Sequence, residues 1–181
     1  MGDPKKPHKK YKTPESPFDQ ERLAEELSLI GTYGLNNKRE LWRIRTMQRN
    51  YLRVAREMLS MEPEKRAVKE KDIKGKLYSL GFIQRDIAVE GILSLKIEDF
   101  LERRLQTFVY RNRLASSLFQ ARQLIVHGHI AVGDGKVYSP SYIVSREDEK
   151  SLRYAPSSPL SSVSHPLRQQ LAAMESGRVE R

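Results

Sequence analysis

The chain has 181 residues and a net charge of +10, from 33 lysines and arginines against 23 aspartates and glutamates. It contains no cysteine, which excludes disulfides, cysteine-ligated zinc, iron–sulfur clusters and a thiol nucleophile. No run approaches the roughly 18 apolar residues of a membrane span, and the first residues lack the apolar core of a signal peptide. We therefore expect one large or two small soluble, intracellular domains that bind a polyanion.

The positive charge is concentrated in two blocks. Residues 1–60 hold 13 basic and 8 acidic side chains, and residues 101–146 hold 7 basic and 2 acidic ones. The segments between and after them, residues 61–100 and 147–181, are balanced. A charge that served solubility alone would be spread more evenly, so this pattern indicates two anion-binding surfaces.

Residues 1–15 form a basic arm with three prolines and almost no apolar side chains. Such a segment cannot offset its own ordering entropy, so we expect it to be disordered until it meets nucleic acid. Its basic side chains are Lys5, Lys6, Lys9, Lys10 and Lys12.

A helix is predicted over residues 16–31. Ser16 is the expected N-cap, Asp19 completes a capping box, and Gly31 is the expected C-terminal end. Its apolar face recurs at helical spacing through Leu23, Leu27 and Ile30.

The helix predicted from Lys38 to about Met61 separates an apolar face from a cationic one. Its cations are Lys38, Arg39, Arg43, Arg45, Arg49, Arg53 and Arg56. A solvated face normally alternates its signs, but here Glu40 and Glu57 are the only acids in the sequence nearby. Like charges one turn apart repel, so we expect phosphates to bind this face, although a merely solvated face stays the alternative. Trp42 falls among the cations, where it either stacks on a base or makes a domain contact.

The segment from residue 62 to residue 96 shows no chemical motif. Ile73, Leu77 and Leu80 predict a short helix that ends at Gly81, and residues 87–95 are apolar enough for a buried connector. Asp86 and Glu90 are an isolated carboxylate pair that suits a solvated face.

The second basic block begins with a helix predicted over residues 97–112, with Arg103, Arg104 and Arg111 on one side. Ser117 and Gln120 resemble a capping box for a helix that ends at Gly128. The apolar period then changes to two, which predicts a hairpin of residues 130–132 and 137–138 and a strand at 142–144. From Ala155 the chain is rich in serine and proline and is expected to be extended, with a last short helix at 167–174.

The motifs of this block resemble the small RNA-binding module named after ribosomal protein S-four. The matching residues are 101–105, 110–111, 116–117, 121–125, 127–128 and 135–137. The resemblance implies a helix-turn-helix packed on a short twisted β-sheet, with the helix pair against an RNA backbone. The side chains that it offers to RNA are Arg103, Arg104, Arg111, Arg113, Ser116, Ser117, Arg122, His127 and Lys136. His127 either contacts phosphate or packs.

The N-terminal half resembles the ribosomal protein family itself, in its archaeal and eukaryotic form, through residues 21–23, 29–35, 37–43 and 95–105. The resemblance implies a structural, primary rRNA-binding protein of the small subunit that clasps a multi-helix junction of the 5′ domain and nucleates assembly. It implies neighbouring ribosomal proteins as partners, a cytoplasmic location and a role in translational accuracy where mRNA enters. The zinc-binding cysteines of some bacterial members are absent, and we expect no cofactor.

Other functions fit less well. His127 and His129 are spaced unlike metal ligands, and no third ligand follows. About 135 residues remain outside the module, which is too few for an RNA-modifying domain, yet an RNA-modifying enzyme or another RNA-binding regulator stays the alternative. DNA-binding proteins concentrate their contacts on one recognition helix, whereas these cations lie in two blocks. Basic amphipathic helices that lie on membranes favour a bulky aromatic content on their apolar face, which the apolar face of the helix at 38–61 lacks.

The sequence thus predicts an α+β fold. We expect a disordered arm at 1–15, a helical rRNA-binding domain at 16–97, the RNA-binding module at 98–146 and a C-terminal extension at 147–181.

Overall fold

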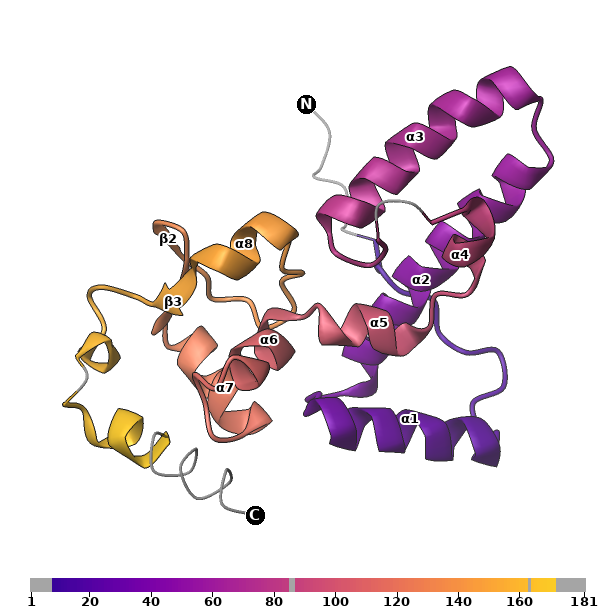
Figure 1. The fold of residues 1–181 in the computed structure, drawn as a ribbon. Coiled ribbons are helices and arrows are strands. Elements are labelled where there is room, and N and C mark those ends of the chain that lie inside the picture. The colour runs from indigo at the N-terminus through magenta and orange to yellow at the C-terminus, as the bar shows by residue number, and fades with distance from the viewer. Residues whose placement is uncertain (1–7, 85–86, 163, 172–181) are drawn as a thin grey trace, which may run out of the picture.

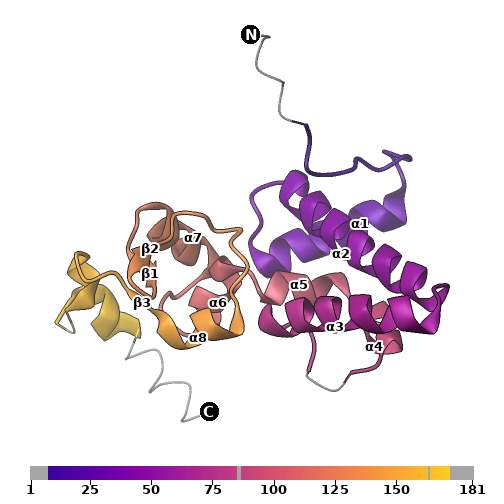
Figure 2. The ribbon, with the colours of Figure 1, turned by 90° about the horizontal axis from the view of Figure 1, so that it is seen from above.

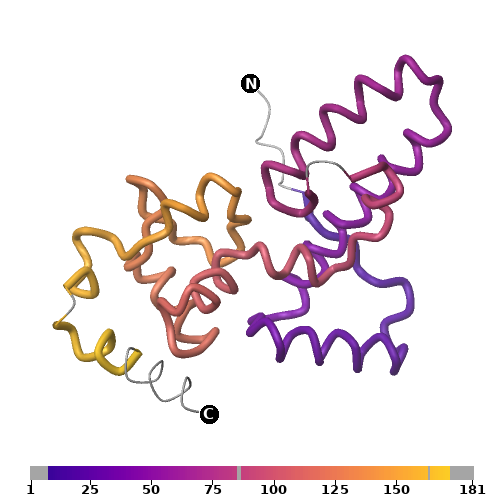
Figure 3. Tube along the Cα trace, viewed as in Figure 1, coloured from indigo at the N-terminus to yellow at the C-terminus, as the bar shows by residue number. Residues whose placement is uncertain are grey.

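The computed structural model describes residues 8–84, 87–162 and 164–171, which form two lobes (Figures 1 and 2). The chain passes from the N-terminal lobe to the C-terminal lobe between α5 and α6 (Figure 3). The N-terminal lobe contains α1 (Gln20–Tyr33), α2 (Lys38–Leu59), α3 (Pro63–Ser79), α4 (Val89–Leu93) and α5 (Ile97–Glu102). The C-terminal lobe contains α6 (Leu105–Arg111), α7 (Leu118–Val126), β1 (Ile130–Val132), β2 (Gly135–Lys136), α8 (Arg146–Ser151), β3 (Leu152–Tyr154) and the 3-10 helix η1 (Pro159–Ser161).

Helix α2 is the centre of the N-terminal lobe. It begins at Asn37, whose side chain accepts a hydrogen bond from the Glu40 backbone N–H. Its apolar face buries Leu41, Ile44, Ala55 and Met58 against α1, α3, α4 and α5. This confirms the predicted amphipathic helix and its separation of apolar from cationic side chains.

In the C-terminal lobe, α6 and α7 pack on each other and share a hydrophobic core with a small antiparallel sheet of strand order β2-β1-β3. In the register of the sheet, Ala131 lies opposite Lys136 on one side and Arg153 on the other. The core of this lobe is separate from that of the other and contains Leu105, Val109, Ala121, Leu124, Ile125, Ile130, Val144 and Leu160. The predicted mixed helical and β architecture is confirmed.

The first helix begins and ends three residues later than predicted. Asp19 is the N-cap and accepts from the Arg22 backbone N–H, so Ser16 is not the cap. The C-cap is Gly34 with φ of 59°, a left-handed conformation that glycine adopts without strain, whereas Gly31 stays helical. Within the helix the acidic Glu26 is buried, and Leu27, which we expected in the core, is exposed.

The single helix predicted over 97–112 is two short helices. Arg103 and Arg104 interrupt it, because the Arg103 carbonyl accepts from Val144 N–H and Leu105 N–H donates to the Tyr142 carbonyl. Residues 142–144 therefore pair with this break, and Ile143 forms only an isolated bridge with Arg104. The prediction of a strand at 142–144 is therefore wrong, because these residues do not belong to the sheet.

The third strand of the sheet comes instead from β3, beyond residue 146 where we expected the module to end. Tyr154 Oη donates to the Leu114 carbonyl at 2.6 Å, and Ala155 N–H donates to the His129 carbonyl at 2.8 Å. Ala155 and Leu160 are buried. The prediction of an extended arm from Ala155 is thus wrong for residues 155–160, because these two apolar side chains and the backbone bonds anchor it. Residues 166–171 are helical, and the rest of the helix predicted at 167–174 lies outside the described residues.

Candidate nucleic-acid interface

Part of the cationic face of α2 holds α1 in place. Glu26 of α1 is fully buried, 3.4 Å from Lys38 Nζ and 3.5 Å from Arg45 Nη1. Trp42 Nε1 donates to Glu26 Oε1 at 3.0 Å. A carboxylate loses its hydration on burial and needs such partners. Lys38 and Arg45, predicted to bind phosphate, are therefore already engaged with Glu26.

Glu26 could not be recognised as a partner of these cations from the acidic residues of α2 alone. The signal was its position in α1, three residues after Leu23 and four before Ile30, inside the apolar stripe. A charged residue at a core position predicts a buried ion pair.

The remaining cations of α2 have a different environment. Arg39, Arg43, Arg49 and Arg56 are exposed, and among the described residues none has a carboxylate within 4.0 Å. Arg53 forms an exposed pair with Glu57 at 3.1 Å. We call Arg39, Arg43, Arg49 and Arg56 the unpaired α2 arginines. Their mutual repulsion would be relieved by a polyanion, and phosphates suit their fixed charge.

Trp42 and the arm contact each other. The rings of Tyr11 and Trp42 lie 6.0 Å apart, and Lys12 N–H donates to Thr46 Oγ1 at 3.1 Å. Trp42 is half-buried between Glu26 of α1 and Tyr11 of the arm, which supports the contact interpretation over base stacking. Lys9 and Lys10 are exposed in the same arm, whereas Lys5 and Lys6 lie outside the described residues.

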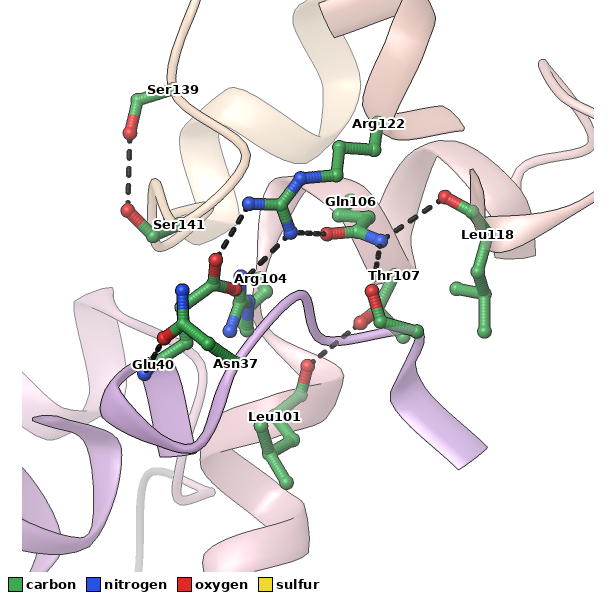
Figure 4. A network of polar contacts seen from close by, with 11 residues as sticks. Asn37, Glu40, Leu101, Arg104, Gln106, Thr107, Leu118, Arg122, Ser139 and Ser141 are labelled. Carbon is green, nitrogen blue, oxygen red and sulfur yellow. Dashed lines mark hydrogen bonds and ion pairs between the residues drawn. The ribbon is translucent and has the colours of Figure 1, made fainter. Parts of the chain in front are cut away.

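Glu40 of α2 joins the two lobes (Figure 4). Its Oε2 lies 2.8 Å from Arg104 Nη2, and its Oε1 lies 2.6 Å from Arg122 Nη2 of α7. Arg104 is 1% exposed, so it cannot present a charge to RNA, and our prediction that it lies on an exposed helix face is wrong. The physical reason is the helix break at Arg104, which turns its side chain toward Glu40.

Gln106 extends this contact. Its amide Nε2 donates to the Gly34 carbonyl at 2.9 Å and to the Leu118 carbonyl at 3.1 Å, and Arg122 Nη1 donates to its Oε1 at 3.3 Å. A Cβ at Gly34 would meet the Leu118 Cβ at 2.8 Å, so only glycine permits this approach. The start of α2, the break before α6 and the start of α7 are thus bound to one another. We call Gly34, Glu40, Arg104, Gln106 and Arg122 the Glu40 network.

The charges in this network shift the pKa of Glu40. Burial alone would raise it, but hydrogen bonds from Arg122 and Arg104 outweigh burial and hold the pKa of Glu40 below its ordinary value of 4.5. Burial also lowers the pKa of Arg104, which the Glu40 carboxylate opposes. Glu40 is therefore ionised at neutral pH.

A second contact joins the lobes through α8. Arg146 Nε donates to the Tyr78 carbonyl and Nη2 to the Ile83 carbonyl, both at 2.9 Å. Its guanidinium also lies 4.4 Å from the centre of the Tyr78 ring. Sequence reasoning gave Arg146 no role, because backbone carbonyl partners leave no sequence signal. The Glu40 network and the contacts of Arg146 together fix the angle between the lobes.

The other predicted side chains of the module divide into two groups. Arg103 is largely buried, donates to the Val144 carbonyl at 3.2 Å and pairs with Glu149, and Ser117 is the N-cap of α7. Gln120 accepts from Ser116 N–H rather than Ser117 N–H, so the predicted capping box is only half formed. Exposed positions are held by Arg111, Arg113, Ser116, His127 and Lys136.

Arg111 is exposed but not free of partners. Its Nη2 lies 2.6 Å from Glu102 Oε1, which also accepts from Tyr33 Oη at 3.1 Å. Burial and the negative charge of Glu102 raise the pKa of Tyr33 to about 12, so its hydroxyl stays a donor. An exposed ion pair of this kind is weak, and a phosphate can compete for Arg111.

Within the described residues, no cluster of three histidine, aspartate or glutamate side chains is placed to hold a metal ion. No helix of this described part is long and apolar enough to cross a membrane. The exposed guanidinium and ammonium groups described above can bind anions.

Comparison with known proteins agrees with this architecture. The family model described as "S4 domain" matches residues 103–150. Small ribosomal subunit protein uS4 of Hyperthermus butylicus is 48% identical over 88% of this chain and 90% of the relative. The same protein of Ignicoccus hospitalis is 49% identical over 88% and 96%, and that of Sulfurisphaera tokodaii is 48% identical over 94% and 96%. With nearly half of the residues shared along both lobes, the chain belongs to the small ribosomal subunit protein uS4 family.

Proposed function

We propose that this protein is a structural constituent of the small ribosomal subunit that binds its rRNA directly. The observation that carries the proposal is the Glu40 network, because it joins a lobe that bears the unpaired α2 arginines to a module of RNA-binding type. The names of the relatives support the same assignment.

In this proposal the two lobes act as one rigid clasp. Phosphate contacts supply affinity without reading sequence, and the fixed angle between the lobes selects an RNA of matching shape. The α2 arginines bind one RNA helix, and Arg111, Arg113, His127 and Lys136 bind another. A junction of several helices is the simplest RNA that offers both at once.

For the finer role we propose what the resemblance to the family implies. The clasp holds a multi-helix junction of the 5′ domain and thereby nucleates assembly of the subunit in the cytoplasm. Neighbouring ribosomal proteins are its partners on the finished particle, and the protein lies on the side where mRNA enters and affects translational accuracy there.

A binding competition tests this function. The probes are a transcript of the 5′ domain, the same transcript with its junction strands rearranged, duplex DNA and anionic vesicles. We expect the intact junction to win by at least about tenfold at physiological salt, since only it satisfies both lobes. Equal affinity for the intact and rearranged transcripts, or a preference for DNA or vesicles, would contradict the proposal.

A further inference from the structure

A groove of about 440 Å³ runs beside α2, between the N-terminal arm and α3. Its volume is within the range of ligand pockets, about 300–1,000 Å³. The apolar part of the lining consists of Met47, Tyr51 and Val54, and no acidic side chain of a described residue contributes to the lining. The basic part consists of Lys10 from the arm, Arg43 from α2 and Lys76 from α3.

The groove is preformed on its apolar side. The Tyr51 ring lies 6.0 Å from the Phe100 ring and is stacked on it, and it lies 6.5 Å from the Phe82 ring. The other side of these rings is the core of the N-terminal lobe, so Tyr51 is held in one position. Burial raises the pKa of Tyr51, so its hydroxyl stays protonated and can donate a hydrogen bond.

Most polar groups of the groove are available to bind a ligand. Arg43 and Lys76 are exposed and, like Lys10, have no carboxylate within 4.0 Å among the described residues. The exposed Asn50 amide makes no hydrogen bond to a described residue, and it offers both a donor and an acceptor. Thr46, in contrast, already accepts from Lys12 and donates to the Trp42 carbonyl.

The basic and apolar side chains of the groove together favour one kind of ligand. Among the described residues, the groove is lined by three cations from three segments and by no acid, so it favours a negatively charged group in the ligand. The apolar part of the lining is an aromatic ring, a thioether and an aliphatic side chain. It favours a flat or apolar group beside the negatively charged one. A nucleotide combines the two, and its base edge can pair with an amide such as that of Asn50.

We propose that this groove holds one unpaired nucleotide of the bound rRNA, with its base against Met47, Tyr51 and Val54 and its phosphate between Lys10, Arg43 and Lys76. The inference rests on the proposed function and adds a base contact to what is otherwise backbone binding. Asn50 is then a base-contacting residue.

Two tryptophan substitutions on α2 test this site. Asn50→Trp fills the groove without removing a cation, and Leu59→Trp adds the same ring to the same helix at an exposed position outside the groove. Each variant is bound to a transcript of the 5′ domain, and base-specific chemical probing maps the protected nucleotides. With the parent chain and Leu59→Trp we expect one unpaired base to be protected, and with Asn50→Trp that protection is lost.

Affinity measurements complete the test. Asn50→Trp should lower affinity about tenfold, the order expected for losing one base contact. Making the protected nucleotide abasic should weaken the parent similarly and have no further effect on Asn50→Trp. Lys76→Gln on α3, which does not alter α2, should weaken the same protection.

The outcomes separate this inference from the proposed function. If the parent binds the junction but Asn50→Trp keeps both its affinity and its protections, the groove is empty in the complex and the inference is wrong. Protection of only paired nucleotides would overturn it as well. If the parent itself shows no preference for the junction, the proposed function fails.

Discussion

Arg104 and Glu40 are 64 residues apart in the sequence, yet Arg104 Nη2 lies 2.8 Å from Glu40 Oε2 where the two lobes meet. Arg104 is 1% exposed, so the carboxylate of Glu40 is what makes its burial tolerable. Arg122 shares the same carboxylate from α7. One acidic side chain therefore links α2, the break before α6 and α7.

Removing the charge of Glu40 should destabilise the fold. Glu40→Gln leaves the Arg104 guanidinium buried without a counter-ion, and breaking such a pair costs about 3–5 kcal/mol. The free energy of unfolding in urea measures this loss. Glu57→Gln is the matched control on the same helix, because the exposed pair with Arg53 should contribute at most about 1 kcal/mol. Equal losses in the two variants would contradict the central place of Glu40.

The contribution of Glu40 should depend on pH. Its pKa in the folded protein lies below 4.5, so the stabilisation is fully present above pH 4.5 and is lost as the pH falls through the folded-state value. The difference in unfolding free energy between the parent and Glu40→Gln isolates this group from the other carboxylates. We expect the difference to be constant from pH 7 to pH 5 and to shrink below pH 4.5. A difference that stays constant down to pH 3 would show that charge is not what stabilises the contact.

The unpaired α2 arginines should control binding without affecting folding. Changing Arg39, Arg49 and Arg56 together to Gln should weaken binding to the 5′ domain transcript. The slope of the logarithm of the binding constant against the logarithm of the salt concentration should become shallower by about one unit per arginine. Stability should stay equal or rise slightly, because like-charge repulsion is relieved.

Arg45→Gln is the control for that triple variant. Arg45 is paired with the buried Glu26, so we expect a loss of stability and a nearly unchanged salt dependence. Binding and salt dependence are measured by titration at several salt concentrations. A triple variant with the parent's salt dependence would mean that this face is only solvated.

The two ends of the chain should differ in limited proteolysis by trypsin. The bond after Arg153 lies in β3, and Ala155 and Leu160 are buried next to it, so it should resist cleavage in the isolated protein. The bonds after Lys9 and Lys10 are exposed and should be cut first, and rRNA should protect them. Mass spectrometry of the fragments identifies the sites. Equal rates of cleavage after Lys10 and Arg153 would contradict the packing of the C-terminal segment.

The elements that could be predicted are those with local signals. The apolar period of α2, the Ser117 cap of α7 and the glycine-containing turn before β2 are all set by residues close in sequence. The resemblance likewise identified the RNA-binding module and the family.

The contacts that could not be predicted are long-range. Glu26 and Glu40 neutralise arginines that look unpaired along their own helix, so the arginines available for RNA could not be told from structural ones. The break at Arg104 depends on backbone bonds to residues 142–144, and the three-residue strand β3 is too short for alternation to show. Such features are fixed by tertiary packing, which overrides local propensity.

Directed cleavage of the RNA shows whether both lobes contact one RNA junction at the same time. The chain has no cysteine, so Leu59→Cys on the N-terminal lobe and Asp134→Cys on the C-terminal lobe each provide a unique site for a tethered iron chelate that generates hydroxyl radicals. Both positions are exposed and neither contributes a cation. We predict that the two chelates cleave different helices of the same junction in the bound 5′ domain transcript. Cleavage from only one of the two positions, or cleavage by both scattered along the transcript, would show that the two lobes do not bind one junction together.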